Sequence, residues 1–159
     1  MSLITSLKAS PLDIPMRKAF GIAGGAQELA RNVLVELTVL SPGDALLGIG
    51  EGAPFPAFNG ETQDIVLASC AKVDLVDVDL FDTATIRERL RDASPSARCA
   101  IETAVVDARA RMKGATLQSY FGAANEAELV TDITITTGTV EDARREAKEF
   151  AAFSTLKIK

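Results

Sequence analysis

Phe153-Ser154-Thr155-Leu156-Lys157-Ile158-Lys159 is the stretch of this 159-residue chain that bears most directly on its fold. The last four residues alternate between apolar and basic side chains, which is the period of a β-strand. In a strand, Lys157 and Lys159 share one face, and Leu156 and Ile158 share the other. An exposed edge strand gives the same pattern, because lysines commonly protect sheet edges. The residues that precede the stretch distinguish the two cases.

Those preceding residues complete a strand–helix–strand unit. Val130-Thr131-Asp132-Ile133-Thr134-Ile135-Thr136 is rich in β-branched residues, which favours a strand. Thr139 then predicts a helix N-cap with an acidic first turn, and apolar residues follow at helical spacing from Ala143 to Ala151. So short a βαβ unit implies parallel strands inside an α/β sheet or barrel, joined by a right-handed crossover. Lysines facing a barrel lumen are costly without a role, so the pattern favours a functional pair.

The first part of the chain predicts a three-stranded antiparallel meander. Residues 4–14 form a strand that we expect Pro15 to end, and a loop with three glycines follows at 16–25. Residues 31–40 alternate as a second strand, and residues 47–51 return as a third after a turn. Four apolar side chains share one face of the second strand: Val33, Val35, Leu37 and Val39.

Three helices are expected after the meander. Residues 61–76 predict the first, Asp82 caps the second, and Ser94 with Pro95 begins the third. One side of the first helix carries Ile65, Ala68 and Lys72. The third helix carries a stripe typical of close packing: Ala97, Ala100, Ile101, Ala104, Val105, Ala108 and Met112. A sheet, three helices and a βαβ unit together predict an α+β domain followed by the start of a barrel.

Composition narrows the classes of function. The net charge is −5, which argues against nucleic acid, and the apolar runs are too short for a membrane span. Histidine is absent, which excludes a Ser-His-Asp triad, a Cys-His pair or a histidine metal site within these residues. Cys70 and Cys99 are far apart in helical patterns, and we interpret both as reduced, buried thiols of a cytoplasmic protein without a signal peptide.

Several motifs resemble the enolase superfamily, and in particular its muconate-lactonizing subgroup. Thr131-Asp132-Ile133-Thr134-Ile135 followed by Leu156-Lys157-Ile158-Lys159 is similar to the first two barrel strands of dipeptide epimerases, including the L-Ala-D/L-Glu type. Further resemblances are Gly50-Glu51-Gly52-Ala53-Pro54, the helix segment 100–108 and Tyr120-Phe121-Gly122. The resemblance implies an N-terminal capping domain at 1–125 and, at 126–159, the start of a (β/α)8 TIM-like barrel that ends at the Lys-x-Lys strand.

The resemblance also implies a chemistry, in which a proton is removed from the carbon next to a carboxylate and Mg²⁺ stabilises the resulting enediolate. Lys159 would be the base on one face of the substrate, Lys157 would contact the carboxylate or tune Lys159, and Thr134 would hydrogen-bond the substrate. Two loops would cover the substrate, a dipeptide or similar small carboxylate. The residues implied for them are Phe20, Ile22 and Gly25 in the first loop, and Phe55 and Phe58 in the second.

Other consequences of the resemblance concern what these residues lack. The metal ligands would lie beyond Lys159, so residues 1–159 alone would bind no metal at the family site and would be inactive, and a homo-oligomer is implied. Uncharged Gly25 stands near the position of a basic residue in L-Ala-D/L-Glu epimerases, so a hydrophobic dipeptide fits as well as an acidic one.

Three enzymes of the same subgroup share Lys-x-Lys: o-succinylbenzoate synthase, muconate cycloisomerase and N-acylamino-acid racemase. A stand-alone capping or assembly module without catalysis is the alternative from another class. The loop 55–60 is likewise open between a covering loop and a rigid surface loop that places Phe55 or Phe58 in the local core.

Overall fold

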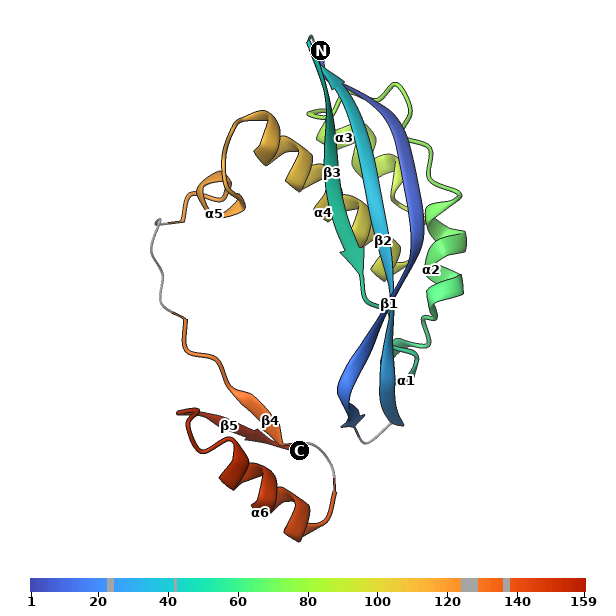
Figure 1. Ribbon diagram of the computed structural model, residues 1–159. Helices are drawn as coiled ribbons and strands as arrows, with labels where there is room; N and C mark the ends of the chain where they lie inside the picture. Colours follow the sequence, from blue (N-terminus) through green and yellow to red (C-terminus); the bar gives the residue numbers. More distant parts are fainter. Residues whose placement is uncertain (23–24, 42, 124–128, 136–137) are drawn as a thin grey trace. The chain divides into compact units, whose positions relative to one another are not determined.

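The computed structural model describes residues 1–22, 25–41, 43–123, 129–135 and 138–159, with the side chains of 18, 20–22 and 25–26 left out of the description. It divides into two compact units, Met1–Ile14 with Ala30–Asn125 and Pro15–Leu29 with Glu126–Lys159. Strands β1 (Leu3–Ile22) and β2 (Gly25–Ser41) have residues in both units, because 15–22 and 25–29 belong to the second (Figure 1). The first unit also contains β3 (Asp44–Gly52), α1 (Pro56–Asn59), α2 (Gln63–Cys70), α3 (Thr83–Arg89), α4 (Pro95–Met112) and α5 (Leu117–Tyr120).

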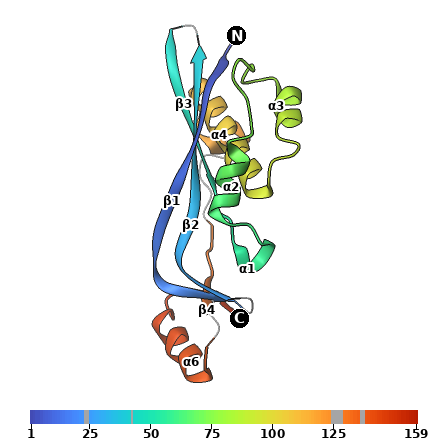
Figure 2. The ribbon, with the colours of Figure 1, turned by 90° about the vertical axis from the view of Figure 1, so that its right-hand side faces the viewer.

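The three long strands form one antiparallel sheet in the order β1-β2-β3, as expected (Figure 1). The pairing of β2 with β3 runs from Val33 opposite Gly52 to Ser41 opposite Asp44. The predicted inner face of β2 is confirmed, because Val33, Val35, Leu37 and Val39 are fully buried. Figure 2 shows α2, α3 and α4 together on one side of the sheet, which is the side these residues face.

Strand β1 is longer than the sequence pattern predicted. It continues through Pro15 to Ile22, so the expectation that Pro15 ends the strand was wrong. Proline removes one backbone donor, and a strand at the edge of a sheet tolerates that loss because one of its sides has no neighbouring strand. Much of the expected loop at 16–25 is therefore strand, and residues 23–24 lie outside the described residues.

Helix α4 packs directly on the backbone of β3. Gly48, Gly50 and Gly52 face the helix, and a Cβ added at any of them would collide with a helix carbonyl, of Ala104, Ala100 and Ser96 respectively. Strand numbers rise while helix numbers fall along this contact, so β3 and α4 run antiparallel. The small-residue stripe expected to pack closely is confirmed as core, with Met112 partly buried at its end.

Helix α2 is shorter than predicted, since the sequence pattern extended it to Val76. It ends at Cys70, and its buried residues are Gln63, Val66 and Cys70, whereas Ile65, Ala68 and Lys72 are exposed. After the helix, residues 77–80 run beside the start of β1. Ile4 and Val78 are joined there by a backbone hydrogen bond of 3.0 Å.

The predictions for the cap of α3 and for Cys70 are confirmed, and the prediction for Cys99 is not. Asp82 caps α3 as predicted, since its carboxylate accepts from Thr85 N at 3.0 Å. Cys70 is buried as expected, whereas Cys99 is exposed, so the interpretation of both thiols as buried was wrong for Cys99. Within the described ranges, no helix is both long and apolar enough to cross a bilayer.

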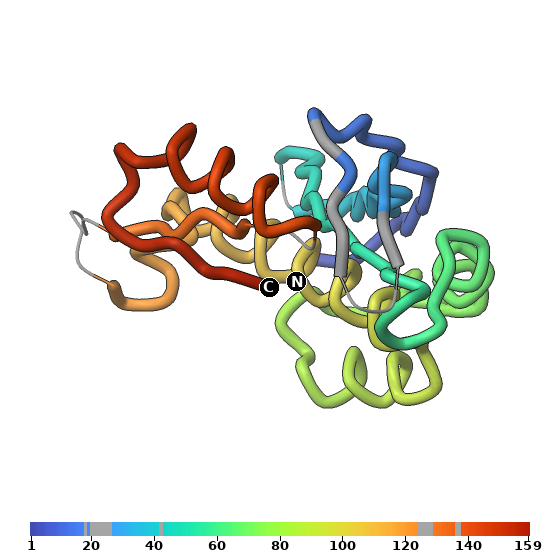
Figure 3. The backbone as a smooth tube through the Cα atoms, turned by 90° about the horizontal axis from the view of Figure 1, so that it is seen from below, coloured from blue at the N-terminus to red at the C-terminus, as the bar shows by residue number. Residues whose placement is uncertain are grey.

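The second unit contains the predicted strand–helix–strand. β4 (Ile133–Ile135), α6 (Val140–Glu149) and β5 (Leu156–Ile158) follow one another, and the two strands pair in parallel. Figure 3 traces this backbone from β4 through α6 to β5. The expectation of an α+β fold followed by a parallel βαβ unit is confirmed. That 1–125 is a capping domain and 126–159 a barrel start stays a prediction.

Candidate functional site

The parallel register of β4 and β5 brings Thr134 beside Lys157. These two residues are direct partners, flanked by Ile133 opposite Leu156 and Ile135 opposite Ile158. Partners in adjacent strands point to the same side of a sheet, and side chains two apart along a strand share that side. Thr134, Lys157 and Lys159 therefore occupy one face, while the four apolar residues occupy the other.

The polar face is accessible. Both lysines are exposed and Thr134 is half-buried, whereas Ile135 on the opposite face is only 1% exposed. The strand end is held by main-chain bonds, with Ile133 N donating to Thr155 O at 3.2 Å and Lys159 N donating to Ile135 O at 3.1 Å. The backbone of Lys159 is thus fixed by the sheet, and its side chain starts from the same face as that of Lys157.

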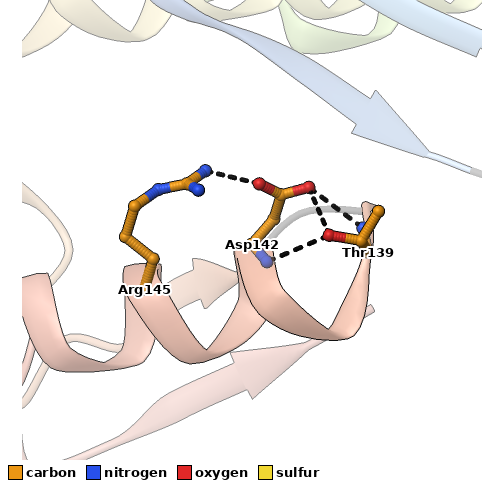
Figure 4. A network of polar contacts seen from close by, with 3 residues as sticks. All are labelled: Thr139, Asp142 and Arg145. Atoms are coloured by element: carbon orange, nitrogen blue, oxygen red, sulfur yellow. Dashed lines mark hydrogen bonds and ion pairs between the residues drawn. The ribbon is translucent and has the colours of Figure 1, made fainter.

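A capping box holds the start of α6 between the two strands (Figure 4). The Thr139 hydroxyl accepts from Asp142 N at 3.1 Å, and the Asp142 carboxylate accepts from Thr139 N at 3.2 Å. Arg145 adds an ion pair to the same carboxylate at 2.6 Å. The Thr139 hydroxyl, and then Arg145, hold the pKa of Asp142 down to about 2. The predicted N-cap at Thr139 is confirmed.

In the first unit, the second expected loop contains the short helix α1. Phe58 is 83% exposed and Phe55 is half-buried, so Phe58 is not placed in the local core. Phe58 N and Asn59 N both donate to Phe55 O, and Gly60 ends the helix with a left-handed φ of 77°. A rigid turn that presents one aromatic side chain to solvent is the observed form of this loop.

Glu61 ties that turn to the start of α4. Its buried carboxylate accepts from Asn59 Nδ2 at 2.6 Å, from Ser96 N at 3.1 Å and from Ser96 Oγ at 2.7 Å. Burial by itself raises the pKa of Glu61, but the hydrogen bonds from Ser96 and Asn59 outweigh it and leave the pKa lowered. Ser94 occupies the predicted N-cap position, yet Glu61 supplies the acceptor for the free amide of the first turn.

Sequence reasoning missed Glu61 and, two residues on, Gln63, which is also buried. Both fall in the stretch 61–76, for which the sequence pattern predicted only a helix. The sequence signal that could have drawn attention to Glu61 is Asn59-Gly60, a turn-forming pair directly before an acidic residue. By contrast, Asp107 has a structural role, because its carboxylate accepts from Ile49 N at 2.8 Å on the edge of β3.

The remaining expected site residues are not brought together by described contacts. The side chains of Phe20, Ile22 and Gly25 lie outside the described residues. Phe55 and Phe58 belong to the first unit, and Thr134, Lys157 and Lys159 to the second. The roles of all these residues therefore stay predictions, although the shared face of Thr134 and the two lysines is a feature of the structure.

The described residues do not fit a magnesium site. Mg²⁺ prefers carboxylate oxygens and bound water, and no group of three acidic, histidine or cysteine side chains within the described ranges is placed to hold a metal. On the polar face of β4 and β5, the charged groups in the described strands are ammonium groups, which repel a cation.

Comparison with known proteins gives a consistent result. No model of a protein family matches the chain. An aromatic dipeptide epimerase of Herpetosiphon aurantiacus is 35% identical over 98% of this chain and 44% of its own length. A solved mandelate racemase/muconate lactonizing enzyme from Roseiflexus sp. is 40% identical, with a TM-score of 0.81, over 98% of this chain and 42% of that one.

A third protein, the dipeptide epimerase from Enterococcus faecalis V583 complexed with Mg and L-Leu-L-Tyr, is 27% identical. It superposes with a TM-score of 0.89 over 99% of this chain and 45% of that one. The chain thus spans just under half the length of the proteins it matches. Over nearly all of its 159 residues, the chain resembles dipeptide epimerases and the mandelate racemase/muconate lactonizing proteins of the enolase superfamily.

Proposed function

We propose that these residues are part of a dipeptide epimerase that inverts the α-carbon of the dipeptide's C-terminal residue. One structural observation supports the proposal more than any other. The parallel pairing of β4 with β5 places Thr134, Lys157 and Lys159 on one face, in the strand pattern that resembles that of dipeptide epimerases. The similarity to proteins named as dipeptide epimerases supports the substrate class.

In the proposed reaction, the neutral amine of Lys159 takes the proton from the α-carbon. The electron pair of the broken C–H bond moves into the carboxylate, which becomes an enediolate. Return of a proton to the opposite face of that carbon gives the epimer, so no atoms or electrons are gained overall. Lys157 binds the carboxylate and stabilises its added negative charge, and the Thr134 hydroxyl donates a hydrogen bond to the substrate.

The groups needed for the other half of the reaction are proposed to lie outside residues 1–159. They are the donor on the opposite face and the ligands of Mg²⁺, an ion named in the description of the Enterococcus faecalis complex. We propose a dipeptide with a hydrophobic or aromatic C-terminal residue. Its support is the absence of charge at Gly25 and the name of the Herpetosiphon aurantiacus relative. A cytoplasmic homo-oligomer is proposed on the same family grounds.

Proton exchange tests the proposal directly. A chain that contains these residues and the remaining barrel strands is incubated in D₂O with L-Ala-L-Phe, L-Ala-L-Leu or L-Ala-L-Glu. Loss of the α-proton signal of the second residue is then followed by NMR. The proposal expects exchange with at least the hydrophobic dipeptides. Exchange with N-acyl amino acids alone, or turnover of a succinylbenzoate precursor or a muconate alone, would assign another reaction. Inactivity toward all of them would favour a binding or assembly module.

A further inference from the structure

Buried polar side chains gather in one part of the first unit. Among the described residues four polar or charged residues are buried: Ser2, Asn32, Glu61 and Gln63. Glu61 and Gln63 belong to the short stretch 61–63, and Asn32 accepts a hydrogen bond from Gln63. Burying a polar group is unfavourable unless hydrogen bonds replace those it makes with water. Their concentration therefore points to a geometric requirement at this place.

Gln63 joins the first two strands of the sheet. Its Nε2 donates one hydrogen bond to Asp13 Oδ1 at 2.8 Å, in β1, and another to the main-chain oxygen of Asn32 at 2.7 Å, in β2. Asn32 continues the connection, because its Nδ2 donates to Glu51 Oε1 at 2.6 Å, in β3. We call these four residues the amide clamp. Both N–H groups of the Gln63 amide are used, so its orientation is fixed.

The position of the amide clamp is specific. Asn32 directly precedes Val33, whose partner Gly52 is the last residue of β3. Beyond this point β1 and β2 continue without a third strand beside them. The first compact unit also ends at Ile14, next to Asp13, and resumes at Ala30. The amide clamp thus holds β1 and β2 where they leave the three-stranded sheet.

The stretch 61–63 also makes hydrogen bonds to the α1 turn, through Glu61. Glu61 binds Asn59 of the α1 turn and Ser96 of α4, and only Thr62 separates it from Gln63. Thr62 itself caps α2, accepting from Ile65 N at 3.2 Å. A shift of Gln63 would be transmitted through one residue to Glu61 and so to the turn that presents Phe58. The strands and the turn are thereby held from a common point.

We propose that Gln63 is a positioning residue, which sets how β1 and β2 leave the sheet and thereby how tightly the substrate's side chain is held. The inference rests on the proposed function, and on the expectation that the loops containing Phe20 and Phe58 cover the substrate, which the resemblance to dipeptide epimerases implies. The hydrogen bonds of the Gln63 side chain go to strand residues Asp13 and Asn32, and not to a residue proposed to take part in the reaction. Loss of Gln63 is therefore expected to raise KM and to leave kcat nearly unchanged.

Gln63→Glu tests the proposal with almost no change of shape. It replaces the donating NH₂ with an oxygen that faces the Asp13 carboxylate and the Asn32 carbonyl, so both hydrogen bonds are lost and the carboxylates repel. Gln118→Glu makes the same chemical change on exposed α5 and serves as the control. Asp13→Ala removes one hydrogen bond at an exposed position and is the milder variant if Gln63→Glu does not fold.

Two measurements are made on the chain that carries the complete barrel. Amide hydrogen exchange is expected to rise about tenfold in peptides containing Asp13 and Asn32, with no change in the middle of α4. KM for L-Ala-L-Phe is expected to rise about tenfold while kcat changes less than about twofold. Adding Asp13→Asn to Gln63→Glu reverses the donor and acceptor of one bond and should restore part of both effects.

The two measurements separate the possible failures. Unchanged exchange in the Asp13 and Asn32 peptides would overturn the amide clamp, whatever the activity. Raised exchange with unchanged KM, or a fall in kcat alone, would overturn the link to substrate binding. If the wild-type chain exchanges no dipeptide proton, the proposed function is wrong and the link to substrate falls with it. The amide exchange would still decide whether Gln63 positions the strands.

Discussion

Thr134 and Lys157 are register partners in the parallel pair of β4 and β5. The pairing puts a hydroxyl group and an ammonium group side by side on a face that also carries Lys159. A shift of one residue would turn the lysines to the opposite face, because side chains alternate along a strand. The burial of Ile135 opposes such a shift, since it would exchange an apolar side chain for a polar one.

The two lysines should differ in their effects on the two substrate isomers. In the complete protein, Lys159→Ala is expected to abolish α-proton exchange from one isomer, with a loss of ~10²–10⁴-fold typical of a missing general base. Lys157→Ala should slow both isomers, because the carboxylate it contacts is common to them. Isomer-resolved exchange in D₂O measures both. Small, equal effects would instead indicate two solvated strand lysines, with stability changed by less than ~0.5 kcal/mol.

The glycines of β3 should be intolerant of alanine in a defined order. Gly50→Ala is expected to be the most destabilising, followed by Gly48→Ala and Gly52→Ala, because the added Cβ comes closest to a helix carbonyl at Gly50. Overpacking of this kind costs about 1–3 kcal/mol and more where backbone must move. Urea midpoints of the three variants give the order. Similar midpoints for all three would contradict the rigid contact between β3 and α4.

Glu61 should contribute stability that depends on pH. Its folded-state pKa lies below the unfolded value of 4.5, so the contribution is present above about pH 4.5 and is lost as the pH falls through the folded pKa. Glu61→Gln is expected to cost about 2 kcal/mol at neutral pH, the size of a charged hydrogen bond, and less in acid. Urea unfolding at several pH values measures this. Exposed Glu88→Gln is the control, and an equal pH dependence in both variants would contradict the prediction.

Asp142 should make α6 sensitive to acid. Because its pKa is lowered from 3.8 to about 2, its stabilising effect is complete above about pH 4 and is lost as the pH falls toward 2. Asp142→Asn should therefore lower the helicity of α6 at neutral pH and remove its change between pH 4 and 2. Helix chemical shifts follow this residue by residue. Glu141→Gln, in the same first turn, is expected to keep the wild-type acid transition.

Local pattern was sufficient for the strands and most helices. Alternation identified the buried face of β2, and β-branched composition with a cap identified the βαβ unit. It failed where the deciding contact is remote in sequence. Ser96 lies 35 positions from Glu61, and the partners of Gln63 lie 31 and 50 positions away, so local pattern does not reveal these contacts.

Other failures and limits have equally specific causes. Pro15 was expected to end a strand because the pattern alone does not show that β1 lies at an edge. The buried side of α2 holds Val66 and Cys70, and apolar spacing in so short a helix does not by itself identify that side. The catalytic and substrate-binding roles of Lys157, Lys159, Thr134, Phe55 and Phe58 stay predictions, since chemistry depends on groups other than these.

Where β3 contacts α4, the spacing of residues along the strand differs from the spacing of residues along the helix. Every second strand residue advances ~6.7 Å, whereas every fourth helix residue advances ~6.0 Å. Over Gly48, Gly50 and Gly52 the two scales drift apart by only ~1.4 Å, about the length of a single bond. Each further step would add ~0.7 Å to this offset. The unequal spacings therefore keep three successive glycines close to helix carbonyls and make a longer contact of this kind progressively poorer.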